Sequence, residues 1–213
     1  MKQIYGMAFS AGTEQKSPGD PKDRKKLVCI GSSTGGPGAL QTVLSRLPDG
    51  IMGPVVIVQH MPPGFTKSLA KRLDTLCDIH VKEAEDGDVL EDGTAYIAPG
   101  GHHLSFRSSG FGTRIRLVDS SPVNGHMPSV DVMFTSASQL RGFDIMAVIM
   151  TGMGSDGTAG LIEMKKQGHT RVIAQSEQSC VVYGMPKSAV QAQVVDQVMD
   201  LDGIALAMAS YLK

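Results

Sequence analysis

Short, uninterrupted apolar runs recur along the chain and end in turns rich in glycine, proline or acidic residues. A short continuous apolar run bounded by turn residues is typical of a strand that is buried on both faces. These runs predict strands at residues 27–30, 54–59, 94–98, 145–150 and 171–174, with a further short strand at 80–84. The run at 145–150 is the most hydrophobic, so we expect it to lie inside the sheet.

Between these runs the apolar residues are spaced every three or four positions, which predicts amphipathic helices. The positions that mark the helices are Leu40, Val43 and Leu44, then Phe65, Leu69 and Leu73, then Val130, Met133 and Phe134, then Leu161 and Met164, and finally Leu201, Ile204, Ala205, Met208 and Leu212. Pro37, Pro128 and Pro186 stand where helices are predicted to begin, a position that suits the fixed backbone angle of proline.

The alternation of strand and helix predicts an α/β fold, with a doubly wound, mostly parallel sheet flanked by helices. Residues 104–107 and 113–118 instead flank a turn rich in serine and glycine. In the second of these segments apolar residues alternate with arginines. This pattern predicts an antiparallel hairpin at one edge of the fold, with one of its faces exposed to solvent.

Composition adds a few limits to this picture. The length of 213 residues and the 41% hydrophobic content suit a single domain at 26–213, and the polar, proline-containing residues 1–25 are predicted to be a flexible N-terminal tail or interdomain linker. A formal net charge of −1 argues against nucleic acid as a partner. We expect no membrane insertion, no metal site and, from three cysteines without ligand spacing, a reducing cytoplasmic location.

The first predicted strand runs directly into Gly31-Ser32-Ser33-Thr34-Gly35, which fits the G-x-S-x-G nucleophile elbow. The flanking glycines permit a sharp turn, and Ser33 as the middle residue would project its hydroxyl above the sheet. A glycine- and serine-rich turn before a helix can also bind phosphate through backbone amides. A non-catalytic phosphate- or nucleotide-binding module is therefore the alternative function.

Two further polar residues follow predicted strands. His60 comes after the strand at 54–59, and Asp156 lies in the turn after the strand at 145–150. Loops at the carboxyl ends of parallel strands meet at one crevice, so we expect Ser33, His60 and Asp156 to lie together. A serine becomes a good nucleophile when an imidazole accepts its proton and a carboxylate orients that imidazole. The three residues supply these roles.

Other residues compete for the same roles. His126 is the second candidate for the base, and we assign it to substrate binding. His102 and His103 are adjacent, so at most one of them would face the crevice. Asp131 is an alternative to Asp156 as the orienting carboxylate, although its place in the first turn of a helix favours a structural role.

Five segments occur in a fixed order, namely GSSTGGPGAL, VVIVQHMPPGFT, YIAPGGHH, GHMPSVDVMF and MTGMGSDGTAG. Together they resemble the catalytic domain of the chemotaxis protein-glutamate methylesterase family, CheB. The resemblance extends from about Lys26 to the C-terminus and implies the same nucleophile, base and orienting carboxylate. It also implies that the backbone amides of Thr34 and Met153 bind the oxyanion.

The resemblance implies a cytoplasmic serine esterase that hydrolyses glutamate γ-methyl esters and deamidates specific glutamines, without a cofactor, in chemosensory adaptation. Its expected partner is the cytoplasmic domain of a methyl-accepting chemoreceptor. Members of the family usually carry an N-terminal receiver domain, and residues 1–25 are too few to form one. We therefore expect a receiver domain, where there is one, to lie outside this chain.

Overall fold

The computed structural model describes residues 24–109, 112–168 and 170–213. In this part of the chain, seven parallel strands form the main sheet, in the spatial order β3-β4-β2-β1-β7-β8-β9. Their bounds are β1 Lys25–Ser32, β2 Val55–Gln59, β3 His80–Glu83, β4 Thr94–Ile97, β7 Phe143–Ile149, β8 Thr170–Gln175 and β9 Gln197–Met199. Apart from its last two residues, the predicted tail or linker at 1–25 lies outside the described residues.

A separate antiparallel hairpin consists of β5 (His103–Ser109) and β6 (Gly112–Val118). Leu104 and Ile115 on its inner face are buried in the core, whereas Arg107 and Arg116 are exposed. The hairpin packs beside α3 (Val130–Ala137). The structure thus confirms the predicted parallel α/β sheet and the predicted hairpin with one solvent-exposed face.

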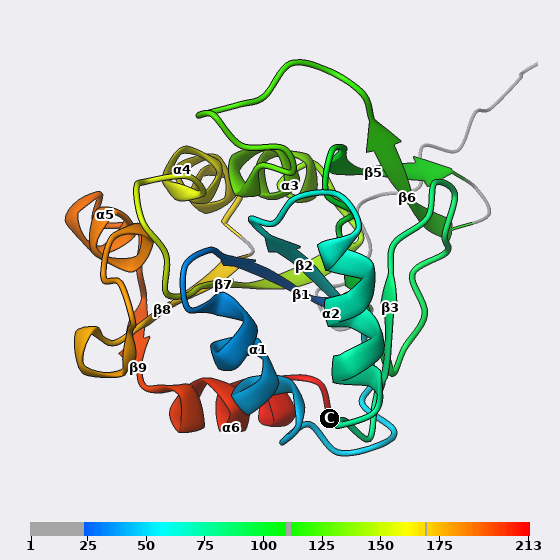
Figure 1. The fold of residues 1–213 in the computed structure, drawn as a ribbon, viewed down its shortest axis with the longest axis horizontal. Coiled ribbons are helices and arrows are strands. Elements are labelled where there is room, and N and C mark those ends of the chain that lie inside the picture. The colour runs from blue at the N-terminus through cyan, green and yellow to red at the C-terminus, as the bar shows by residue number, and fades with distance from the viewer. Residues whose placement is uncertain (1–23, 110–111, 169) are drawn as a thin grey trace, which may run out of the picture.

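Helices cover both faces of the main sheet (Figure 1). On one face lie α1 (Gly36–Leu44), α2 (Phe65–Asp74) and α6 (Leu201–Tyr211), and on the other lie α3, α4 (Thr158–Lys166) and α5 (Met185–Gln191). A 3₁₀ helix, η2 (Glu177–Ser179), follows β8. The two sets of helices produce two apolar cores, one on each side of the sheet.

Strand β1 lies in the middle of the sheet, with β2 on one side and β7 on the other. Its residues point alternately into the two cores, with Cys29 in one and Ile30 in the other, and both are fully buried. This double burial explains why β1 is apolar without alternation. The order of connections reverses at β1, and in open α/β sheets the crevice beyond the carboxyl ends of strands at such a point is where ligands bind.

Candidate active site

Ser33 directly follows β1 and begins a sharp turn into α1. Its N–H donates to the carbonyl of Thr151 at 3.0 Å, and the chain then turns at Gly35, which has a φ of +83°. A Cβ on Gly152 would lie only 2.8 Å from the Cβ of Ser33. The elbow therefore depends on glycine twice, once for a left-handed backbone angle and once for the close approach of the loop after β7.

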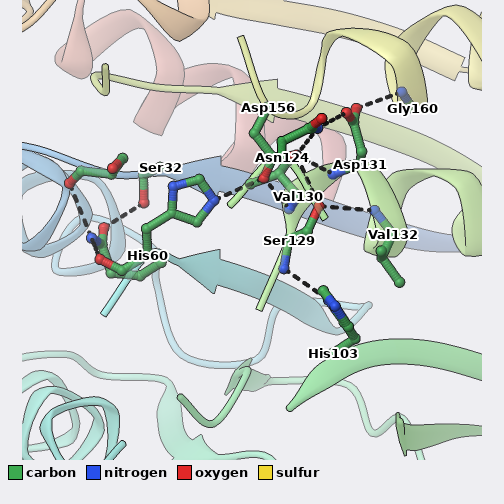
Figure 2. Close-up of polar contacts among 12 residues, drawn as sticks. Ser32, His60, His103, Asn124, Ser129, Val130, Asp131, Val132, Asp156 and Gly160 are labelled. Atoms are coloured by element: carbon green, nitrogen blue, oxygen red, sulfur yellow. Dashed lines mark hydrogen bonds and ion pairs between the residues drawn. The ribbon is translucent and has the colours of Figure 1, made fainter. Parts of the chain in front are cut away.

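His60 directly follows β2 and lies in reach of the same loop. Its N–H donates to the carbonyl of Ser32 at 3.0 Å, and its ring Nε2 lies 2.8 Å from Oδ2 of Asp156 (Figure 2). Their side chains are 6% and 1% exposed. A carboxylate can only accept, so we assign the ring proton to Nε2, and the lone pair then lies on Nδ1.

The Nδ1 atom of His60 is buried and has no hydrogen-bond partner among the residues that the structure describes. A buried polar atom without a partner is costly, so such atoms are rare and concentrate at functional sites. In the familiar serine-protease triad the carboxylate binds Nδ1 and the serine faces Nε2. Here the carboxylate binds Nε2, which leaves Nδ1 as the atom that can accept a proton.

The Asp156 carboxylate lies at the N-terminus of α3, where unpaired backbone amides and the helix dipole favour an anion. It accepts five hydrogen bonds from described residues: His60 Nε2 at 2.8 Å, Asn124 Nδ2 at 3.0 Å, Ser129 Oγ at 2.8 Å, Val130 N at 2.7 Å and Asp131 N at 3.3 Å. Burial acts to raise the pKa of Asp156, but the bonds from His60, Asn124, Val130 and Ser129 outweigh it and hold the pKa well below its usual range. Asp156 is therefore ionised whenever the protein is folded near neutral pH.

Asn124 and Asp131 complete the surroundings of Asp156 (Figure 2). The Nδ2 of Asn124 bridges Asp156 Oδ1 and Asp131 Oδ2, at 3.0 and 2.8 Å, and so separates the two carboxylates. Asp131 Oδ1 accepts from the Gly160 amide of α4 at 2.7 Å. Burial and the charge of Asp156 raise the pKa of Asp131. Asp131 has no contact with His60 among these bonds, so the candidate orienting carboxylate is Asp156.

The two adjacent histidines lie in different environments, as the alternation of an extended segment predicts. His102 is exposed. His103 is 1% exposed, accepts from the Ser129 amide on Nδ1 at 3.1 Å, and donates from Nε2 to the carbonyl of Ser121 at 3.1 Å. His103 therefore holds the backbone of Ser129, whose hydroxyl is one of the donors to Asp156.

His126 lies against the candidate base. Its ring stacks on that of His60, with ring centroids 3.7 Å apart and an angle of 9° between the planes. Burial, with a smaller contribution from His60, lowers the pKa of His126. His126 thus stays uncharged to a lower pH than an ordinary imidazole and covers one face of the His60 ring.

The amides of Thr34 and Met153 border the turn at Ser33. Neither donates a hydrogen bond to another described residue, and both residues are exposed. Thr34 is held through its carbonyl, which accepts from Thr151 Oγ1 at 2.9 Å. Within the described chain, therefore, neither N–H group has an acceptor.

Two supporting residues of the site, Asn124 and Ser129, are not among those predicted from the sequence. Ser129 is the N-cap of α3, and its Oγ accepts from the Val132 amide at 3.5 Å while donating to Asp156. A serine directly before an apolar helix is a cap signal that the sequence does contain. Asn124 gave no such signal, because its role depends on a loop conformation with a φ of +54°.

Ser33, His60 and Asp156 thus follow three adjacent strands at the topological switch point, where His60 is bonded to Asp156 and, among the described residues, Ser33 Oγ makes no hydrogen bond to His60 Nδ1. These are the residue types of a serine-hydrolase site. The comparisons with known proteins point to hydrolases. A family model described as CheB methylesterase matches residues 28–208, and the chain belongs to this family.

Relatives and a solved structure extend the match. The chain is 54% identical over 191 residues to a protein-glutamate methylesterase/protein-glutamine glutaminase of Geobacillus kaustophilus, covering 90% of this chain and 55% of that protein. It is 49% identical over 193 residues to the one of Bacillus subtilis, covering 91% and 54%. The crystal structure of the Thermotoga maritima CheB methylesterase catalytic domain matches with a TM-score of 0.85 and 43% identity, covering 87% of this chain and 98% of that one. The chain spans about half the length of these curated relatives.

Proposed function

We propose that residues 26–213 form a methylesterase catalytic domain that hydrolyses glutamate γ-methyl esters and deamidates specific glutamines. The observation that carries this proposal is the geometry of the His60 ring. The ring is bound through Nε2 to an ionised carboxylate, and its buried Nδ1 has no partner among the described residues. Ser33 begins the turn that follows β1, the strand next to the one that precedes His60. The names of the relatives, protein-glutamate methylesterase/protein-glutamine glutaminase, support the substrate class.

In the proposed reaction, Ser33 Oγ attacks the side-chain carbonyl carbon while His60 Nδ1 takes the hydroxyl proton. The tetrahedral intermediate collapses, the bond to methoxide breaks, and His60 returns the proton to give methanol. For a glutamine substrate the leaving group is ammonia. Water then attacks the acyl-enzyme, His60 accepts its proton and passes it to Ser33 Oγ, and glutamate is released. Asp156 stabilises the imidazolium that forms in each half.

The oxyanion of the intermediate would be bound by the Thr34 and Met153 amides. Their lack of acceptors within the described chain supports this role. Amides held in place before the reaction stabilise the developing charge without reorganising, and removing one such donor from other enzymes costs about 3 kcal/mol. These steps require no cofactor.

The proposed substrate is carried by the cytoplasmic domain of a methyl-accepting chemoreceptor, and a receiver domain is a further proposed partner. Both belong to a chemosensory pathway in the cytoplasm. No described helix has the length and apolar character to span a membrane.

The direct test is to incubate the 213-residue chain with a receptor methylated in its cytoplasmic domain. Mass spectrometry should show the loss of methyl groups from glutamates, with release of one methanol per ester. A receptor that stays fully methylated, while a small ester is hydrolysed, would contradict the substrate assignment and leave the esterase chemistry standing.

His126 offers a smaller prediction. His126→Ala should lower the turnover number by about 2- to 10-fold, since a stacked ring pair is worth about 0.5–1.5 kcal/mol and its loss leaves His60 free to move. His126→Phe keeps a ring of similar width and should retain most of the turnover. Steady-state rates of ester hydrolysis check both variants. If His126→Ala instead raises KM for the receptor and leaves the turnover number unchanged, then His126 contacts the substrate as the sequence suggested.

A further inference from the structure

Gln59, the last residue of β2, has a buried side chain between the two halves of the site. It is 2% exposed. Its Oε1 accepts from Ser32 Oγ at 2.8 Å, and its Nε2 donates to the carbonyls of Ser33 at 3.0 Å and His60 at 3.1 Å. A carboxamide has two N–H donors, and here both are used. A Cβ on Gly36 would lie 1.9 Å from Oε1, so the start of α1 packs directly on this group.

One of these bonds helps to fix the peptide that contains the Thr34 amide. The carbonyl of Ser33 and the N–H of Thr34 belong to the same planar peptide and point in opposite directions. The Ser33 carbonyl is held by Gln59 Nε2 and by the Gly36 amide at 2.8 Å. A hydrogen bond to the carbonyl of a peptide also polarises its N–H and makes it a stronger donor.

The other bond holds the backbone of the candidate base. Gln59 Nε2 binds the His60 carbonyl, and the His60 amide binds the Ser32 carbonyl at 3.0 Å. The same carboxamide thus spans the ends of β1 and β2 and ties the Ser33 backbone to the His60 backbone. The substrate has no access to it, because the side chain is buried.

We propose that Gln59 is a positioning residue of this site, whose carboxamide aims the Thr34 N–H at the oxyanion and sets the separation of the Ser33 and His60 backbones. This inference rests on the proposed function, since it assigns Gln59 to the same reaction. Gln59 acts through its neighbours and is not a catalytic residue.

The test compares Gln59→Met and Gln59→Glu in the 213-residue chain. Methionine has a similar length and cannot hydrogen bond to either carbonyl, and glutamate can accept from Ser32 but, when ionised, donates to neither carbonyl. Ile204→Val, on the buried side of α6 and across the sheet from α3, is the control for a modest loss of stability. The measurements are the melting temperature, the rate of fluorophosphonate labelling at Ser33, and the turnover number and KM for p-nitrophenyl acetate.

Both Gln59 variants should lose about 10- to 100-fold in labelling rate and turnover number, with KM within about twofold of the wild type, because small errors of alignment cost about this much. The Thr34 amide resonance in ¹⁵N–¹H spectra should shift. Ile204→Val should label at the wild-type rate. If Gln59→Met fails to fold, Gln59→Glu provides the same comparison.

Two results would separate this inference from the proposed function. Wild-type labelling rates in folded Gln59 variants, or a loss confined to KM, would overturn the positioning role while leaving methylesterase activity intact. Conversely, a wild-type chain that is labelled at Ser33 but leaves a methylated receptor unchanged would overturn the proposed substrate. In that case slow labelling of the Gln59 variants would still support the positioning role.

Discussion

Replacing Ser33 with alanine is expected to abolish ester hydrolysis, with a fall in turnover number of at least about 10⁴-fold. Removing the nucleophile of a serine hydrolase leaves only the residual catalysis of substrate binding and oxyanion stabilisation. The packing around Ser33 gives no reason for a change in stability, because its bond to the Thr151 carbonyl is made by the backbone amide. The variant should therefore fold normally and be inactive, as methanol release would show.

Two serine variants control this experiment. Ser32→Ala removes the neighbouring hydroxyl, which is fully buried and donates to Gln59 Oε1. Because this hydroxyl acts only through Gln59, its loss should lower the turnover number by no more than the Gln59 variants do, about 10- to 100-fold, and Ser33 should still be labelled. Ser45→Ala, at the exposed C-terminal end of α1, should behave as the wild type. Labelling that persists in Ser33→Ala would show that another residue is the nucleophile.

The same variant separates the esterase from a phosphate-binding module. A phosphate site in the turn at residues 31–38 would use backbone amides, which Ser33→Ala retains. Phosphate binding that survives the substitution, in a chain whose wild type hydrolyses no ester, would favour the binding module. Loss of esterase activity in a normally folded variant would favour the hydrolase.

The sequence was sufficient to predict the strands that carry the site. Strands β1, β2 and β7 are buried on both faces, so they appear as apolar runs, and the polar residues in the turn after each run are candidates for the crevice. His60 and Asp156 were identified in this way, and the structure brings them to 2.8 Å from each other. Burial on both faces of the sheet is what made these positions predictable.

Features that depend on backbone bonds were not predictable. Strand β9 was missed because Gln197 and Val198 are exposed, and it is defined by its pairing with β8 and not by an apolar pattern. Gln59 was interpreted only as the end of an apolar run. Its two bonds to backbone carbonyls need the strands to be adjacent and in register, which a single sequence does not reveal.

Asp156→Asn is expected to lower the turnover number by about 10⁴-fold, as the corresponding change does in the serine-protease triad. Asp156 Oδ2 accepts from His60 Nε2, and this bond keeps the lone pair on Nδ1. An asparagine amide turned towards Nε2 would favour the opposite tautomer, with the proton on Nδ1, and this tautomer cannot accept the proton of Ser33. Steady-state hydrolysis of a small ester measures the loss, and Asp78→Asn, at an exposed position beyond the end of α2, is the matched control.

This substitution should also lower stability, by about 3 kcal/mol at neutral pH, because it removes a buried charge and places an N–H₂ group among donors such as Asn124 and the Val130 amide. For a domain of this size that loss corresponds to a fall in melting temperature of about 6–12 °C.

The loss of stability in Asp156→Asn should depend on pH. The folded pKa of Asp156 lies below its unfolded value of about 3.9. Its ionised form therefore stabilises the wild type fully above the unfolded pKa, and that contribution disappears as the pH falls through the folded pKa. The difference in melting temperature between wild type and Asp156→Asn should be constant from about pH 6 to 8 and should shrink below about pH 4. A difference that instead grows on acidification would mean that Asp156 is protonated in the folded protein, and the assignment of an ionised carboxylate behind His60 would be wrong.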